Sequence, residues 1–168
     1  YVYKQPQKSI NQKRAVVPID YSPVSNEVIR KADQWALENQ VELFFLYVQE
    51  TPEMMNVSAV GGGYYTTSSD YENRIRHSSK QVEELEERLR QRVRENNVTS
   101  PYQVHIDFGK PYIKILDLCE GLMASTLIMA SHSHTTAGRL IMGSNTDYLL
   151  HHAHCSMYIL KNYELDEA

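Results

Sequence analysis

Short apolar segments alternate with longer amphipathic segments along most of the chain. The apolar segments are rich in Val, Ile, Leu and aromatic residues, which is typical of strands that are covered on one or both faces. In residues 102–108, apolar and polar positions alternate, which indicates a half-buried strand at a sheet edge. The pattern predicts five strands, at residues 13–20, 41–48, 102–108, 126–131 and 155–161.

Four helices are predicted between these strands. The first ends near Asn39, and the third begins at Pro111, a residue that is favourable in the first turn of a helix. The second helix carries an apolar stripe and places Glu84 and Arg88 at the spacing of an ion pair. Because helices alternate with strands, the sequence predicts a three-layer α/β domain with a parallel sheet and helices on both faces. The second and fourth helices are predicted at residues 79–96 and 144–153.

Three segments lack this alternation. Residues 1–12 are polar and indicate a tail or linker, and residues 162–168 form a short acidic tail. Residues 49–78 contain Gly61-Gly62-Gly63 and a Thr/Ser run without a sustained period, so a long variable insertion is predicted there. Residues 13–161, which include this insertion, are therefore predicted to form a single domain.

Composition narrows the classes of partner. The 168 residues are 42% hydrophobic and 23% charged, which is enough apolar material for one globular core. A formal charge of −4 and a pI near 6.0 provide no basic field, so nucleic acid is not an expected partner. No apolar run approaches the roughly 18 residues of a membrane helix, and the first residues lack the apolar core of a signal peptide. We therefore expect a cytoplasmic protein without membrane insertion.

The cysteines and histidines do not predict a metal site. Cys119 and Cys155 are isolated in the sequence, and both are expected to be reduced, buried thiols. Histidines are frequent at two places, but their spacing matches no zinc template, so no metal is expected. The residues that invite a metal are His132, His134, His151, His152, His154 and Cys155.

Residues 126–147, TLIMASHSHTTAGRLIMGSNTD, carry the main candidate chemistry. An apolar run gives way to small and polar residues, then to Gly143-Ser144, and then to a segment compatible with a helix. A loop of this kind directs backbone N–H groups inward, and the helix start adds unpaired N–H groups and the positive end of its dipole. The arrangement predicts an anion site, and phosphate is the anion that fits it best.

This loop resembles the nucleotide loop of the universal stress protein family, which reads G-x-x-G, nine residues, then G-S or G-T after an apolar strand. Here Ala130 and Ser133 replace the two leading glycines, residues 134–142 supply the nine positions, and Gly143-Ser144 follow. The turn Gly109-Lys110-Pro111 is similar to the family's G-x-P turn. The resemblance covers roughly residues 13–161. It implies an adenine-nucleotide alpha-hydrolase-like fold with an all-parallel sheet of strand order 3-2-1-4-5.

The resemblance also implies a binding site for ATP or AMP, with or without Mg²⁺, in the crevice between strands 1 and 4. In nucleotide-binding members the ends of strands 1 and 2 hold the adenosine and the loop holds the phosphates. By position, Asp20 would accept hydrogen bonds from the ribose, and Ser144 would donate to a phosphate from its hydroxyl and its N–H group. The residues carried over are Pro18, Ile19, Asp20, Val48, Met129, Ala130, Ser133, Gly143, Ser144 and Asn145, with charge from His132 and Arg139.

Two readings of function remain open. The first is a stress-response regulatory protein in which nucleotide occupancy tunes interactions with an unidentified protein partner, with slow ATP hydrolysis at most. The alternative is a family member that binds no nucleotide and acts as a dimeric interaction module, which the replacement of glycine by Ala130 and Ser133 favours. A dedicated enzyme would require a paired base that the sequence does not show. In either reading the apolar closing strand, residues 155–161, is expected to pair with its twin in a homodimer.

Overall fold

The structure is a computed structural model that describes residues 13–50, 68–131 and 144–161. Strands and helices alternate along these residues, and each predicted strand and helix is present. Their bounds are β1 Lys13–Pro18, α1 Val24–Asn39, β2 Val41–Gln49, α2 Ser68–Glu95, β3 Tyr102–Phe108, α3 Pro111–Gly121, β4 Thr126–Ser131, α4 Ser144–His152 and β5 Ser156–Lys161. The strands form one parallel sheet in the order β3-β2-β1-β4-β5. The fold predicted from the sequence is confirmed.

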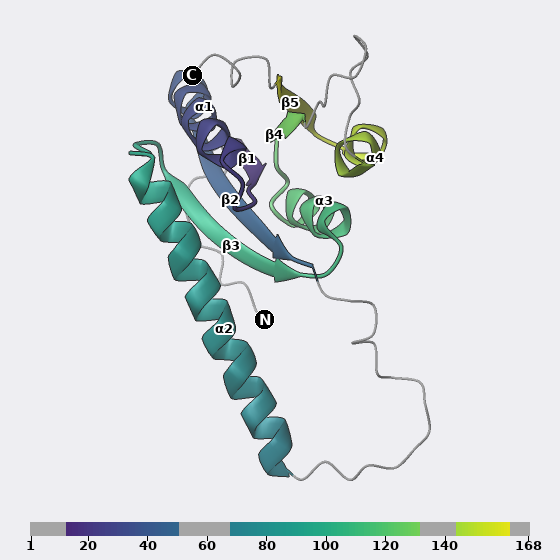
Figure 1. The fold of residues 1–168 in the computed structure, drawn as a ribbon. Coiled ribbons are helices and arrows are strands. Elements are labelled where there is room, and N and C mark those ends of the chain that lie inside the picture. Colours follow the sequence, from purple (N-terminus) through teal and green to yellow (C-terminus); the bar gives the residue numbers. More distant parts are fainter. Residues whose placement is uncertain (1–12, 51–67, 132–143, 162–168) are drawn as a thin grey trace.

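Alternate residues of each central strand face opposite helical layers. Val17 of β1 and Phe45 of β2 pack with α1 and α2, whereas Val16 and Phe44, their sequence neighbours, pack with α3 and α4. Figure 1 shows these two pairs of helices on opposite sides of the sheet. Because both faces are covered, the central strands are apolar at nearly every position, as in other buried parallel sheets.

The middle of the sheet opens at the carboxyl end of β1. Pairing of β1 with β2 continues to Pro18, opposite Leu46, but the register of β1 with β4 ends at Val16, opposite Leu127. Pro18 donates no backbone hydrogen bond, so it suits the last position of a strand. Strand order also reverses here, since the chain passes from β1 outward to β3 and returns to β4 beside β1. In open parallel sheets, such a reversal is where ligands bind.

One predicted boundary is wrong. Residues 68–78 belong to α2, which begins at Ser68 rather than near residue 79. Figure 1 shows the first part of α2 extending beyond the edge of the sheet. Residues 68–78 have no sustained apolar stripe in the sequence, so periodicity gave no signal for this part of the helix. The rest of the predicted insertion, residues 51–67, and both predicted tails, residues 1–12 and 162–168, lie outside the described residues.

No helix within the described part of the chain combines the length and the apolar character that crossing a bilayer requires.

Candidate functional site

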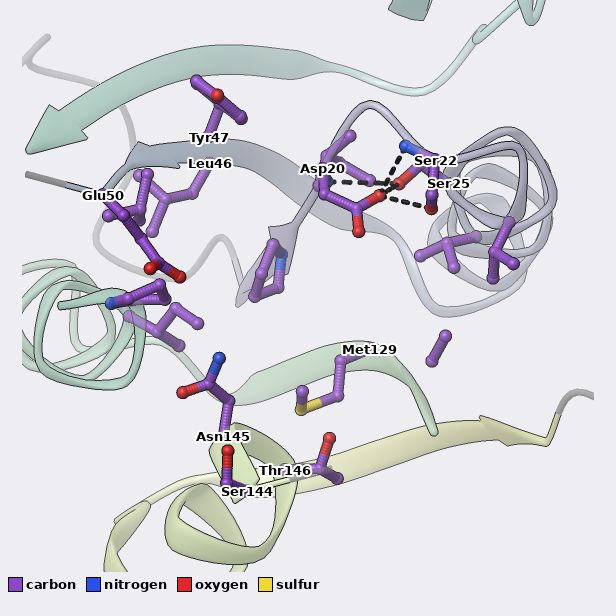
Figure 2. A pocket seen from close by; sticks show the side chains of 18 residues that line it. Asp20, Ser22, Ser25, Leu46, Tyr47, Glu50, Met129, Ser144, Asn145 and Thr146 are labelled. Atoms are coloured by element: carbon purple, nitrogen blue, oxygen red, sulfur yellow. Dashed lines mark hydrogen bonds between the residues drawn. The ribbon is translucent and has the colours of Figure 1, made fainter. Parts of the chain in front are cut away.

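A cavity of about 390 Å³ lies at the carboxyl ends of β1, β2 and β4. The first turns of α1, α3 and α4 close its sides, and Figure 2 shows the side chains that line it. Its volume is within the range of small-molecule sites. Of the residues predicted from the sequence, the structure places these around the cavity: Pro18, Ile19, Asp20, Val48, Met129, Ala130, Ser144 and Asn145. The other predicted residues, His132, Ser133, Arg139 and Gly143, lie outside the described part of the chain.

One wall of the cavity is apolar. Leu46 of β2 and Met129 of β4 lie on either side of β1, and both pack in the core beneath α3 and α4. Val48 and Ile115 continue this wall at the end of β2 and in the first turns of α3. A planar apolar group, such as an aromatic base, could be buried against such a surface.

Asp20 stands at the opposite rim, in the connection between β1 and α1. Its Oδ1 accepts hydrogen bonds from the N–H group of Ser22 at 2.9 Å, from the hydroxyl of Ser22, and from the hydroxyl of Ser25 at 2.6 Å. Ser25 Oγ also accepts the N–H group of Asp20 at 3.2 Å. Figure 2 shows these bonds converging on one carboxylate oxygen. They hold the carboxylate in a single orientation toward the cavity mouth.

The two serines do not cap helix α1. Ser22 and Ser25 are residue types that commonly cap helices. In the structure the N-cap of α1 is Pro23, with no side-chain cap hydrogen bond, and the serine hydroxyls satisfy Asp20 instead. The nearby carboxylate is a stronger hydrogen-bond acceptor than a neutral group, so both hydroxyls donate to it.

The first turn of α4 forms the side of the cavity opposite Asp20. Ser144 is exposed, Asn145 is half-buried, and Thr146 has an exposed fraction of only 3%. Figure 2 shows all three across the cavity from Asp20, with Met129 between. The first N–H groups of a helix have no partner within it, and its dipole is positive at this end. This side of the cavity is therefore suited to a negatively charged group.

Several lining residues were not identified from the sequence as site residues. Glu50 directly follows β2, and Pro111 and Ile115 belong to the first turns of α3. The topological signal that found Asp20 could have found them, because the ends of neighbouring parallel strands and the helices that follow share one edge of the sheet. The lining residues missed are Ser22, Val24, Ser25, Val28, Leu46, Tyr47, Glu50, Pro111, Ile115 and Thr146.

The described lining is acidic rather than basic. It contains the carboxylates of Asp20 and Glu50, and no Lys or Arg is among the described residues that line the cavity. Within that part of the chain, the positive features of the site are the N-terminal ends of α1, α3 and α4, whose first turns line it. No group of three or more His, Cys, Asp and Glu residues in the described ranges could hold a metal ion.

Helix α2 supports the loop that carries Asp20. The guanidinium of Arg88 lies over the ring of Tyr21, 4.5 Å from its centroid, and Arg92 lies 5.9 Å from the same ring. The predicted pairing of Arg88 with Glu84 is therefore replaced by a cation–π contact, and Glu84 lies 3.7 Å from Lys80. An exposed ion pair contributes little to stability, so the contact of Arg88 with a partly buried ring is favoured over it.

Tyr21 is also packed from its other side. Its ring lies 4.6 Å from that of Tyr47, and Arg92 donates a hydrogen bond to the carbonyl of Ser22. Burial raises the pKa of Tyr21, and the positive charge of Arg88 opposes this effect. These contacts fix the backbone on both sides of Tyr21, next to Asp20.

The chain is similar to known proteins over most of its length. Residues 12–161 match the model of the universal stress protein family, and the chain belongs to that family. A universal stress protein of Methanocaldococcus jannaschii is 23% identical over 151 residues, which are 89% of this chain and 82% of the relative. The family resemblance found in the sequence is confirmed.

Solved structures of family members share the fold. One universal stress protein, determined in complex with cAMP, has a TM-score of 0.59 and 15% identity, and the match covers 89% of this chain and 97% of that one. The universal stress protein of Archaeoglobus fulgidus, in complex with dAMP, has a TM-score of 0.50 and 16% identity, with 90% and 98% covered. At these identities the likeness shows the fold alone.

Proposed function

We propose that this protein is a stress-response regulatory protein that binds an adenine nucleotide, ATP or AMP, in the cavity between β1 and β4. The observation that carries the proposal is the opposition of Asp20 and the first turn of α4 across a cavity of about 390 Å³ with an apolar wall. The complexes of related structures with cAMP and dAMP support an adenine nucleotide as the ligand class.

The parts of a nucleotide match the parts of the cavity. The base packs against Leu46, Val48 and Met129, which are apolar and come from the ends of two strands. The ribose hydroxyls donate to the carboxylate of Asp20, which the two serines already hold in position. The phosphates lie at the first turn of α4, where Ser144 adds a hydroxyl donor to the backbone N–H groups.

The charges of the residues that line the cavity affect how many phosphates the bound nucleotide can carry. Asp20 and Glu50 would repel a polyphosphate, and the helix starts that line the cavity supply only partial positive charges. AMP carries less charge and suits these residues directly. ATP suits them when Mg²⁺ accompanies it, because oxygen ligands such as carboxylates and phosphates are those that Mg²⁺ prefers.

In this proposal the nucleotide acts as a signal rather than as a substrate of rapid turnover. Its occupancy changes which protein partner the molecule binds, and we expect ATP hydrolysis to be slow at most. The exposed edge of β5, where the exposed fraction of Tyr158 is 40%, is the surface through which we propose the homodimer forms. The cytoplasmic location stays a prediction from the sequence.

Isothermal titration calorimetry with AMP, with ATP plus Mg²⁺, and with adenosine tests this proposal. Ser144→Asp places a negative charge at the start of α4, where it favours the helix but repels a phosphate. Gln81→Glu adds the same charge at an exposed position of α2, outside the cavity lining, and is the matched control. We expect both nucleotides to bind the wild type and the control alike. Ser144→Asp should weaken both by roughly tenfold or more and leave adenosine unchanged.

Two results would contradict the proposal. Equal weakening of adenosine and AMP by Ser144→Asp would show that no phosphate lies at α4. A protein with an intact thermal transition that gives no binding heat with millimolar nucleotide would show that it does not bind the nucleotide. That second result would favour the alternative, a dimeric interaction module of the same family.

A further inference from the structure

The two cysteines of the chain, 36 positions apart in sequence, lie together in the folded protein. Cys119 is near the end of α3, and Cys155 is in the short connection between α4 and β5. Both belong to the core beneath α3 and α4, together with Leu127 and Leu149. The sequence predicted two isolated buried thiols, whereas the structure forms a pair. Both are free thiols in the structure.

The two thiols are chemically unequal. A side-chain hydrogen bond joins them, and it raises the pKa of Cys119 while it lowers the pKa of Cys155 to about 7, against the opposing effect of burial. Cys155 is also the more accessible of the two, since Cys119 has an exposed fraction of only 7% and Cys155 is half-buried. An accessible thiolate beside a protonated thiol is the arrangement of a reactive and a resolving cysteine.

We propose that Cys119 and Cys155 form a reversible thiol–disulfide site, in which Cys155 reacts first with hydrogen peroxide and Cys119 then closes an intramolecular disulfide. In the first step the Cys155 thiolate attacks a peroxide oxygen, the O–O bond breaks, and the departing hydroxide takes a proton to become water. Cys155 is now a sulfenic acid. In the second step the sulfur of Cys119 attacks that of Cys155, the S–O bond breaks, and the proton of Cys119 leaves with the hydroxyl group as a second water. Together the two thiols lose two electrons, which reduce one hydrogen peroxide to two molecules of water.

Removal of the Cys155 thiolate in the first step enables the second. The hydrogen bond to Cys155, burial and the negative charge of Cys155 all raise the pKa of Cys119, and that charge is gone once Cys155 is a sulfenic acid. Thiols that meet in one core, as these two do, can approach bonding distance by rotation of their side chains. The order of reaction therefore follows from the charge and exposure of the two side chains.

The disulfide would tie the end of α3 to the start of β5. The loop that it closes, residues 119–155, contains β4 and α4 and the whole phosphate side of the candidate site. Closing a loop of this length restricts the unfolded chain, so the oxidised protein should melt at a higher temperature, by roughly 5–10 °C. Helices α3 and α4 begin at Pro111 and Ser144, which line the cavity, and both helices run from there toward the cysteine pair.

Mass spectrometry and thiol titration on the full chain test this proposal. The wild type, treated with a small excess of hydrogen peroxide at pH 7, should lose both thiols and about 2 Da while it stays a single chain under denaturing conditions, and dithiothreitol should restore both thiols. Because the chain has only two cysteines, an intramolecular bond can join no other pair. Cys155 should react roughly three- to tenfold faster than the same thiol in urea-unfolded protein.

Two single variants assign the order of reaction, and far-UV circular dichroism verifies that each is folded. In Cys119→Ala, Cys155 should stop at the sulfenic acid and be trapped by dimedone. In Cys155→Ala, Cys119 should remain reduced over the same time. Three results would each overturn the proposal. The first is disulfide bonds that form only between separate chains, and the second is equal rates of thiol oxidation in the two variants. The third is a wild type whose thiols react no faster than they do in urea.

Discussion

Asp33 offers the sharpest test of how the helices are attached to the sheet. This residue of α1 accepts hydrogen bonds from the N–H groups of Thr99 and Ser100, at 3.2 and 2.8 Å, and from both of their hydroxyls. Thr99 and Ser100 lie in the connection between α2 and β3. One carboxylate therefore joins α1 to a segment that is distant in sequence. We predict that Asp33→Ala and Asp33→Asn both destabilise the protein.

The magnitude depends on which donors lose a partner that water cannot replace. Thr99 is exposed, but Ser100 has an exposed fraction of 4%, so its N–H group is shielded from solvent. A hydrogen bond to a charged group contributes about 1.5–3 kcal/mol, and an unsatisfied buried donor costs about 1–3 kcal/mol. These terms overlap, so Asp33→Ala should cost about 2–4 kcal/mol of unfolding free energy. Asp33→Asn keeps one acceptor oxygen and should cost about 1–2 kcal/mol.

The pH dependence has a definite sign. Burial raises the pKa of Asp33, but the hydrogen bonds from Ser100 and Thr99 lower it by more, so the folded pKa lies below the ordinary value. A carboxyl group of this kind stabilises the fold above its unfolded pKa, about 3.9, and loses that contribution as pH falls through the folded value. The advantage of the wild type over Asp33→Asn should be constant between pH 7 and about 5, and shrink below about 4.

Urea unfolding followed by circular dichroism, at pH 7 and near pH 3, measures both quantities. Glu38→Gln is the matched control, because Glu38 is an exposed acid of the same helix that accepts a hydrogen bond only from Gln34 among the described residues. Its effect should stay within about 0.5 kcal/mol. The reasoning is refuted if Asp33→Asn is as stable as the wild type at pH 7. It is also refuted if the difference in unfolding free energy between the two proteins does not shrink near pH 3.

Two further predictions concern single positions. Tyr21→Phe should raise the unfolding free energy slightly, by about 0.5–1 kcal/mol in denaturant titration, because the buried hydroxyl of Tyr21 has no hydrogen-bond partner among the described residues; a loss of stability would show that the hydroxyl is satisfied. Gly109→Ala should cost about 1–2 kcal/mol, because φ is +130° there, a backbone conformation that residues with a Cβ rarely adopt. Gly121→Ala, in α3 with open space around it, should instead be neutral or stabilising, and equal effects of the two substitutions would contradict this account.

The order and type of the elements could be predicted from the sequence because they depend on local patterns. An apolar run such as residues 41–48 is continuous because β2 is covered on both faces, and the alternation in residues 102–108 reflects an edge strand with one covered face. Where the sequence has no apolar stripe, as at residues 68–78 of α2, the pattern carried no signal.

Much of the candidate site could also be predicted, for a topological reason. Asp20, Val48, Ala130 and Ser144 follow or end strands, or begin helices, and in a parallel sheet those positions gather at one edge. The placement needed only the strand order, which the family resemblance supplied. What these residues bind remains the proposal made above.

The contacts that join distant side chains were decided only by the tertiary structure. Arg88 stacks on Tyr21 rather than pairing with Glu84, and Cys119 meets Cys155 across 36 positions of sequence. Periodicity states which face of an element is buried, but not which residue of another element it meets there. That choice depends on how the helices pack over the sheet, which only the folded arrangement of all the layers determines.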